Sequence, residues 1–255
     1  MRIALPEFEH PVIREAFSGL DGVEGVPAEG LAEACELVRR GEAEAVVAGI
    51  EFSSRDVILA CRDGLGMTGS TFSGSFVLMR GDECYVIGDA AACKHPTAEQ
   101  LYEIVCQTWE TARAVLEAEP RVAMLSFSTA GSGGRDETID LIREVVTRVR
   151  AERPEILIDG EMQLDAAVAP EVAAAKGLGE SAVAGRANVW ILPDLNTGNI
   201  LYKAMERCGG FTAAGPILQG FRGLASDLSR GSSAEDVRGV VGVLRRLAED
   251  RGGER

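Results

Sequence analysis

Short apolar runs alternate with amphipathic stretches along the chain. Five runs resemble buried β-strands, each leading into a turn and then a helical pattern: Ile3 to Leu5, Ala45 to Ile50, Val122 to Phe127, Ile156 to Ile158 and Val189 to Leu192. Four stretches with apolar residues every three or four positions predict helices: Leu31 to Arg40, Ala98 to Leu116, Glu137 to Arg150 and Ala234 to Leu247. This alternation predicts an α/β fold, with helices on both faces of a mostly parallel sheet.

One segment interrupts the alternation. Ser70 to Met79 and Glu83 to Gly88 flank the turn formers Gly81 and Asp82, which predicts two antiparallel strands. We place a division between two lobes near residue 120, just before an expected strand, which gives an N-terminal lobe of residues 1–120 and a C-terminal lobe of residues 121–255.

Composition narrows the classes of partner. The 255 residues are 46% hydrophobic, enough to bury one large core or two smaller ones. Lys and Arg total 26 against 40 Asp and Glu, so the net charge of -14 repels polyanions, and we expect no nucleic-acid partner. No stretch approaches the roughly 20 apolar residues that span a bilayer, so we expect no membrane partner and a cytoplasmic location.

The cysteines and histidines indicate reduced thiols rather than a metal site. The six cysteines include no CxxC pair, and only His10 and His95 are available beside them. We therefore expect no structural metal and no disulfide framework.

Two glycine-rich segments are candidate phosphate loops. Gly64, Gly66 and Gly69 satisfy GxGxxG, but they follow a helical pattern and precede a strand, the reverse of a dinucleotide site, so a helix-to-strand turn is expected. The segment from Ser126 to Gly134 instead follows a strand and precedes a helix that Asp136 is placed to cap. Its candidate phosphate donors are Ser128, Thr129, Gly131 and Ser132. An ordinary strand-to-helix loop is the alternative.

The segment from Gly215 to Val237 is the most informative. Ser229 and Arg230 lie in a loop, Ser233 is a plausible helix N-cap, and Asp236 falls in the first turn of the last helix. A hydroxyl, a guanidinium and a carboxylate near one helix start could bind an oxyanion and move a proton. Alternatively, Asp236 only completes a capping box with Ser233.

Several collinear segments resemble the phosphate acetyltransferase and phosphate butyryltransferase family. They are RVAMLSFST, LIDGEMQLDAAVAPEVAA, VAGRANVWILPDLNTGNILYK, GPILQGF and DLSRGSSAEDV, which cover most of residues 121–237. Weaker matches are RIALPEFEHP, RRGEAEAVVAG and HPTAEQLYEI. The resemblance implies a two-lobe, three-layer α/β/α fold with a central cleft, related to isocitrate and isopropylmalate dehydrogenases, and usually a homodimer.

The implied reaction is acyl-CoA plus phosphate to acyl phosphate plus CoA, in a ternary complex without a metal or a bound cofactor, since coenzyme A is a substrate. By resemblance, Asp236 is the base that deprotonates the CoA thiol, and Ser229 and Arg230 form the oxyanion and phosphate site. Donors placed in advance stabilise a tetrahedral oxyanion. Further substrate-binding residues are expected in the matched segments: Asn196, Gly198, Asn199, Lys203 and Gln219.

Two departures keep a second function open. The N-terminal lobe is shorter than in the family, and a gapless match places Leu59 where the family has a substrate-binding arginine. Arg55 or Arg62 is the candidate replacement. The alternative is a catalytically altered relative that binds CoA or acyl phosphate as a sensor or partner subunit. An oxidoreductase of the related fold lacks support, because no cluster of metal-binding aspartates is found.

Overall fold

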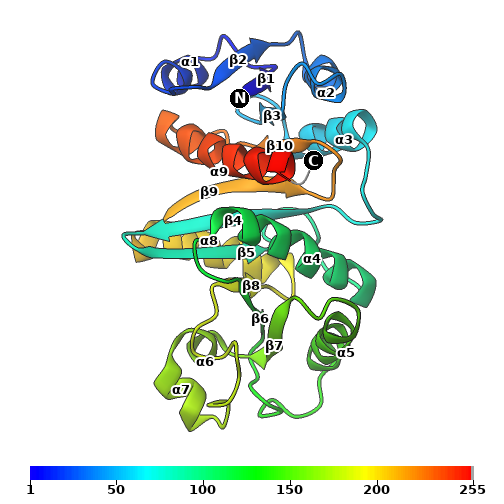
Figure 1. Ribbon diagram of the computed structural model, residues 1–255, viewed down its shortest axis with the longest axis vertical. Coiled ribbons are helices and arrows are strands. Elements are labelled where there is room, and N and C mark those ends of the chain that lie inside the picture. Colours follow the sequence, from blue (N-terminus) through cyan, green and yellow to red (C-terminus); the bar gives the residue numbers. More distant parts are fainter. Residues whose placement is uncertain (254–255) are drawn as a thin grey trace. The chain divides into compact units, whose positions relative to one another are not determined.

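The computed structural model describes residues 1–253 and divides the chain into two compact units (Figure 1). Unit 1 comprises Met1–Phe76 together with the C-terminal stretch from Thr212, and unit 2 comprises Val77–Phe211. The division expected near residue 120 falls inside unit 2. The chain returns to unit 1 after residue 211, where its last two strands pair with each other and with an N-terminal strand.

Unit 1 contains a five-strand arrangement in the order β2-β1-β3-β10-β9. β1, β2, β3 and β10 are parallel, and β9 runs antiparallel to β10. α1 packs against α9 and α2 against α3. The elements are β1 (Arg2–Leu5), α1 (Pro11–Phe17), β2 (Glu24–Pro27), α2 (Leu31–Arg39), β3 (Ala45–Ala48), α3 (Ser54–Leu65), β9 (Thr212–Gln219), β10 (Leu224–Asp227) and α9 (Ala234–Gly253).

Unit 2 has the strand order β4-β5-β8-β6-β7, in which β5, β8, β6 and β7 are parallel. α4 packs on α5, and α5 packs on β7. The elements are β4 (Ser73–Arg80, which begins in unit 1), β5 (Glu83–Gly88), α4 (Ala98–Val115), β6 (Arg121–Leu125), α5 (Glu137–Glu152), β7 (Leu157–Met162), α6 (Leu164–Val168), α7 (Pro170–Ala175), β8 (Val189–Ile191) and α8 (Leu195–Gly209).

The α/β class and the mostly parallel strands are confirmed. All five strands and four helices expected from the apolar pattern are present, with ends shifted by a few residues. The GxGxxG segment is the expected helix-to-strand turn: α3 ends at Leu65, and Gly66 follows as its cap with φ of 78°. None of the described helices combines the length and apolar character that crossing a bilayer requires.

Parallel strands bring the loops at their carboxyl ends to one edge of each unit. In unit 1, these are the loops after β1, β3 and β10, since Asp227 at the end of β10 is in register with Ala48 at the end of β3. In unit 2, the loops after β5, β8, β6 and β7 share an edge for the same reason. Ligands of open α/β sheets bind at such edges, so both loop sets are candidates.

Candidate active site

The loop that carries Ser229 and Arg230 is fixed to the end of β3. The backbone N–H of Leu228 donates to the Ala48 carbonyl at 2.6 Å. Gly49 follows with φ of 117°, and a Cβ there would lie 2.5 Å from Asp227 Oδ1 and 2.5 Å from the Leu228 carbonyl oxygen. Only glycine allows this approach, so the start of the Ser-Arg loop depends on a residue more than 170 positions away.

Both side chains of the predicted pair are exposed. Ser229 N–H donates to Ser232 Oγ at 3.0 Å, and Gly231 N–H donates to Ser229 Oγ at 3.4 Å, so the loop forms a tight turn. Within residues 1–253, no ion pair or hydrogen bond engages the Arg230 side chain. Its guanidinium can therefore present a two-donor edge to a phosphate or a carbonyl oxygen.

Asp236 lies at the third position of α9 and completes a capping box with Ser233. Asp236 Oδ2 accepts from the N–H and the hydroxyl of Ser233, both at 2.8 Å, and Asp236 N–H donates to Ser233 Oγ at 3.2 Å. Asp236 therefore has the helix-capping role that was the alternative to catalysis. Both capping bonds end on Oδ2, which leaves Oδ1 without a hydrogen bond from the described part of the chain.

The loop between β3 and α3 is organised by Glu7, a residue that the sequence analysis missed. Its side chain is buried and accepts the backbone N–H groups of four consecutive residues, 49 to 52. Successive N–H groups that converge on one point form an anion site, and here a carboxylate of the same chain fills it. Glu7 thereby holds the loop after β1 to the loop before α3.

Arg55 and Arg62, the two candidate replacements for the family's arginine, lie at opposite ends of α3. Arg55 is exposed in the first turn, two residues after the N-cap Ser53, in the helix that follows β3 in the chain. Arg62 is in the last turn, about 10 Å away along the helix, and pairs with Asp63 at 2.8 Å. Leu59 between them is half-buried. The geometry brings Arg55, and not Arg62, to the edge that carries Ser229.

Gln219 does not join this group. It ends β9, which runs antiparallel to β10, so it lies beside the start of β10 rather than beside Asp227. The Gln219 side chain is buried and accepts a hydrogen bond from Ser73 Oγ at 2.9 Å. This placement favours a structural role.

In unit 2, the glycine and hydroxyl loop after β6 follows its predicted outline, but its donors already serve an internal anion. Asp136 caps α5 as expected, accepting from Thr138 N–H at 2.8 Å. Ser128 Oγ donates to Glu161 Oε1 at 2.9 Å, and Gly131 N–H donates to the same oxygen at 2.8 Å. Glu161 is buried in β7.

Arg143 on α5 completes this network. Its Nε lies 2.8 Å from Glu161 Oε2, and its Nη2 lies 3.2 Å from Oε1. Burial on its own raises the pKa of Glu161, but hydrogen bonds from Arg143, Gly131 and Ser128 outweigh it and hold the pKa below the usual value. Glu161 is therefore ionised at neutral pH, and it engages two of the four donors, Ser128 and Gly131, that the sequence assigned to phosphate.

The two remaining residues of the loop are also engaged locally. Thr129 Oγ1 accepts from Gln163 N–H at 3.0 Å, and Thr129 N–H donates to Ser132 Oγ at 3.0 Å. Thr129 is buried, whereas Ser132 is exposed. Of the four predicted phosphate donors, only Ser132 keeps an exposed side chain.

α8 carries the other predicted residues of unit 2. Asp194 caps it by accepting from Thr197 N–H at 2.8 Å. Asn196, Asn199 and Lys203 are spaced three and four residues apart, so they share one face of the helix. Asn196 and Lys203 are exposed and Asn199 is half-buried. These side chains form a polar face available to a ligand.

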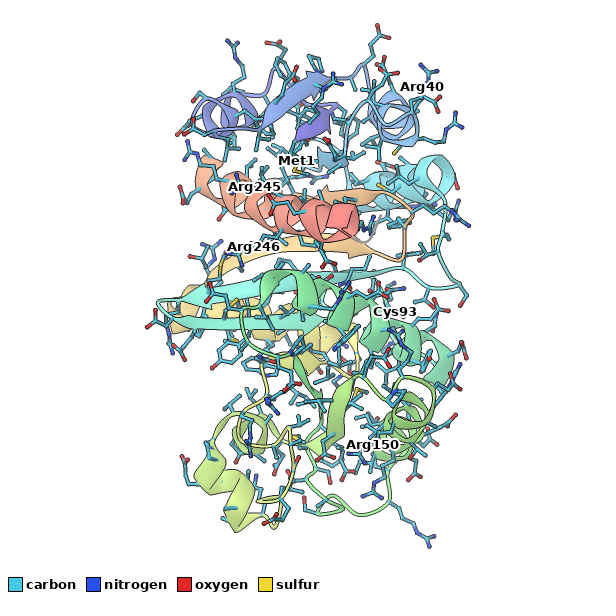
Figure 2. The ribbon with its side chains drawn as sticks, in the orientation of Figure 1. Met1, Arg40, Cys93, Arg150, Arg245 and Arg246 are labelled. Atoms are coloured by element: carbon cyan, nitrogen blue, oxygen red, sulfur yellow. The ribbon has the colours of Figure 1, made fainter. Side chains whose placement is uncertain are left out.

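Gly198 has a different task. A Cβ at this position would lie 2.3 Å from the carbonyl oxygen of Asp89, so glycine lets α8 approach the loop after β5. Asp89 is itself buried, and its carboxylate accepts the N–H groups of Ala91, Ala92 and Cys93, the last of which is labelled in Figure 2. The absence of a side chain at Gly198 is thus required by packing.

The family model described as Phosphate acetyl/butaryl transferase matches residues 25–243 of the chain. The chain belongs to this family. The phosphate acetyltransferase of Bacillus subtilis is 42% identical over 207 residues, which cover 79% of this chain and 62% of that protein. The chain thus spans less than two thirds of the length of that curated relative.

Solved structures agree with the family assignment. A phosphotransacetylase from Streptococcus pyogenes superposes with a TM-score of 0.87 at 33% identity, covering 98% of this chain and 94% of that one. A putative 4-hydroxythreonine-4-phosphate dehydrogenase from Salmonella typhimurium has a TM-score of 0.53 at 13% identity and shows similarity of fold alone. The predicted relation to a dehydrogenase-like fold is consistent with this likeness.

Proposed function

We propose that this chain transfers a short acyl group between coenzyme A and inorganic phosphate. One observation carries the proposal: Arg230 is exposed and unengaged among residues 1–253, and it lies in the same loop as Ser229 and six residues before Asp236. Membership of a family whose relatives are named phosphate acetyltransferase supports the same reaction.

Asp236 is the proposed general base. A thiol with a pKa of about 8.5 is mostly protonated at neutral pH, so attack by coenzyme A on an acyl phosphate needs a proton acceptor. The capping bonds to Oδ2 fix the carboxylate in place and leave Oδ1 to take the proton. As the C–S bond forms, the bond between the carbonyl carbon and the phosphate oxygen breaks, and phosphate leaves.

Ser229 and Arg230 are the proposed oxyanion and phosphate site. Attack on the carbonyl carbon builds negative charge on its oxygen, and donors already in position stabilise that charge without reorganising. The Arg230 guanidinium can hold phosphate before the reaction and the developing oxyanion during it. Binding both substrates in one ternary complex supplies the rate advantage of proximity, so no covalent acyl-enzyme is needed.

Arg55 is the proposed replacement for the arginine that the family has at the position of Leu59. It belongs to the first turn of a helix whose start lies at the edge that also carries the Ser-Arg loop. In unit 2, the exposed face of Asn196, Asn199 and Lys203 is a proposed contact for coenzyme A. Ser132 is the one loop residue of that unit proposed to touch substrate through its side chain.

Three further expectations remain part of the proposal. Coenzyme A acts as a substrate, with no resident cofactor or metal. The protein works in the cytoplasm, and its assembly is a homodimer. Size-exclusion chromatography with light scattering measures the last point, and a monomer at working concentration would contradict it.

The decisive test separates a transferase from a sensor. Purified protein is incubated with coenzyme A and a panel of acetyl, propionyl and butyryl phosphates, and thioester formation is followed by absorbance. The proposal predicts many turnovers with at least one acyl phosphate. Calorimetric binding of coenzyme A without turnover on any of them would favour the altered relative that only senses its ligand.

A further inference from the structure

The proposed reaction gives no role to the buried carboxyl group of Asp227. Asp227 is the last residue of β10 and is 5% exposed. Its Oδ1 atom is fully buried and has no hydrogen-bond partner among the described residues. Buried carboxyl oxygens normally have partners, because an unpaired one loses its bonds to water without replacement.

The strand pattern explains where this side chain points. Ala225, two residues earlier, belongs to the apolar core that also contains residues of α2 and α3. Because alternate residues of a strand share a face, Asp227 points to the same side. Its register partner on β3 is Ala48, and neither β3 nor β9 contains an ionisable residue, so neither strand brings an ionisable group to it.

Among the residues that the structure describes, the elements packed against Asp227 bring Ser54 and Cys61 on α3, and Glu7 after β1, to act on it. Burial raises the pKa of Asp227 to about 6, the charge of Glu7 adds to the rise, and the Ser54 hydroxyl opposes it. The pKa of the Cys61 thiol is raised by its hydrogen bond with Cys35, by burial and further by the charge of Asp227.

The position couples this carboxyl to the Ser-Arg loop. Oδ1 faces the backbone of Gly49, the first of the residues whose N–H groups bind Glu7. The next residue, Leu228, is tied to Ala48, and Ser229 and Arg230 follow at once. Asp227 is therefore two and three residues before Ser229 and Arg230, so a change of its charge affects the residues proposed to bind phosphate.

We propose that Asp227 is a positioning residue whose protonation state sets how tightly the Ser229–Arg230 loop binds an anion, the neutral form binding more tightly. This inference rests on the proposed function only in placing the anion at Arg230. When Asp227 is protonated, it is neutral and does not repel the Glu7 carboxylate. Ionisation adds a second buried negative charge next to Glu7 and close to the bound anion, and both effects oppose anion binding.

Sulfate is the probe, because it keeps two negative charges across the pH range of the test, whereas phosphate gains charge there. For a dianion and a carboxylate on the order of 10 Å apart near a protein surface, in salt at about 0.1 M, the screened repulsion weakens sulfate binding by about 3-fold to 10-fold. Calorimetric titration with sulfate from pH 5 to 7.5 should show this rise in Kd with a midpoint near pH 6.

Two variants make the test specific. Asp227→Asn keeps the shape of the neutral acid and should hold the Kd at its low-pH value throughout. Ser226→Ala removes the hydroxyl that donates to the Pro216 carbonyl from the neighbouring position, changes no charge, and should follow the wild type. The proposal would be overturned if the Kd for sulfate did not change with pH in wild type, or if it rose equally in Asp227→Asn. It would also be overturned if the protein did not bind sulfate.

A measurement on the wild type alone covers the case in which Asp227→Asn does not fold. Carbon-detected NMR of aspartate side-chain carboxyls should find one aspartate that titrates near pH 6, and titration of every aspartate below pH 5 would overturn the proposal. Sulfate binding needs no turnover. A protein that is inactive but binds sulfate in a pH-dependent way would therefore contradict the proposed acyl transfer and support the role of Asp227. An active enzyme whose sulfate binding does not change with pH would support acyl transfer and contradict the role of Asp227.

Discussion

Asp236 has two tasks in this structure, and two substitutions separate them. Asp236→Asn removes the proton acceptor but keeps an oxygen that can accept from the N–H and hydroxyl of Ser233, so the capping geometry survives. Ser233→Ala does the opposite: it removes the capping hydroxyl and leaves the carboxylate with the backbone N–H of residue 233.

The expected magnitudes differ by task. Loss of an N-cap hydroxyl costs about 0.5–2 kcal/mol, and each kcal/mol lowers Tm by about 2–4 °C in a chain of this size. Ser233→Ala should therefore lose a few degrees of Tm and keep kcat within about 3-fold. Asp236→Asn should keep Tm within about 2 °C and lose about 100-fold or more in kcat, equivalent to about 2.7 kcal/mol of transition-state stabilisation.

Thermal unfolding and initial rates of thioester formation on the same protein batches provide both readouts. A wild-type kcat in Asp236→Asn would contradict this prediction, because Asp236 would then be only a capping residue. An equal loss of activity in Ser233→Ala and Asp236→Asn would also contradict it, because the helix cap rather than the base would then account for the effect.

Three further changes test other parts of the site. Arg230→Lys should lower kcat by about 10-fold to 1,000-fold while KM for phosphate changes less, since an ammonium cannot hold two oxygens in one plane; a loss in KM alone would make Arg230 a ground-state anchor. Arg55→Ala should raise KM for an anionic substrate about 10-fold, whereas Arg62→Ala should leave KM unchanged. Equal effects of the two substitutions in steady-state kinetics would contradict the choice of Arg55 over Arg62 as the substrate-binding arginine. Glu161→Gln should lower the free energy of unfolding by about 2 kcal/mol, measured in urea, because Arg143 loses its buried carboxylate partner. Hydrogen bonds hold the folded-state pKa of Glu161 below its usual value, so the wild type keeps this contribution above the usual glutamate pKa of about 4.3 and loses it as pH falls through the lower folded-state pKa. A difference between wild type and variant that does not change with pH would contradict this.

The sequence pattern predicts the regular elements well where local signals are strong. The apolar run that forms β6 and the helical period of α4 each identify their element without help from the rest of the chain. β10 gave no such signal: it is four residues long, and its two polar residues, Ser226 and Asp227, are buried by neighbouring strands. Its existence depends on pairing with β3, which is remote in sequence, and so does the division into units.

The exposed residues of the candidate site carry local sequence signals, whereas its buried residues do not. Ser229, Arg230 and the capping role of Asp236 follow from a local motif. The roles of the Glu7 and Glu161 carboxylates could not be predicted in the same way, because their backbone donors are remote in sequence. The nearest N–H donor is 42 residues from Glu7 and 30 residues from Glu161. An acidic residue near the end of a strand, opposite a glycine-rich loop, is the signal that could have identified both.

A comparison of wild type with Arg230→Ala decides whether this chain is an acyltransferase. Purified wild-type protein is mixed with acetyl phosphate and coenzyme A, and thioester is followed by absorbance beside Arg230→Ala protein prepared in the same way. We predict sustained formation of acetyl-CoA over many turnovers in wild type, with release of one phosphate per thioester, and a rate at least about 100-fold lower in the variant. Thioester formation no faster in wild type than in Arg230→Ala would contradict it.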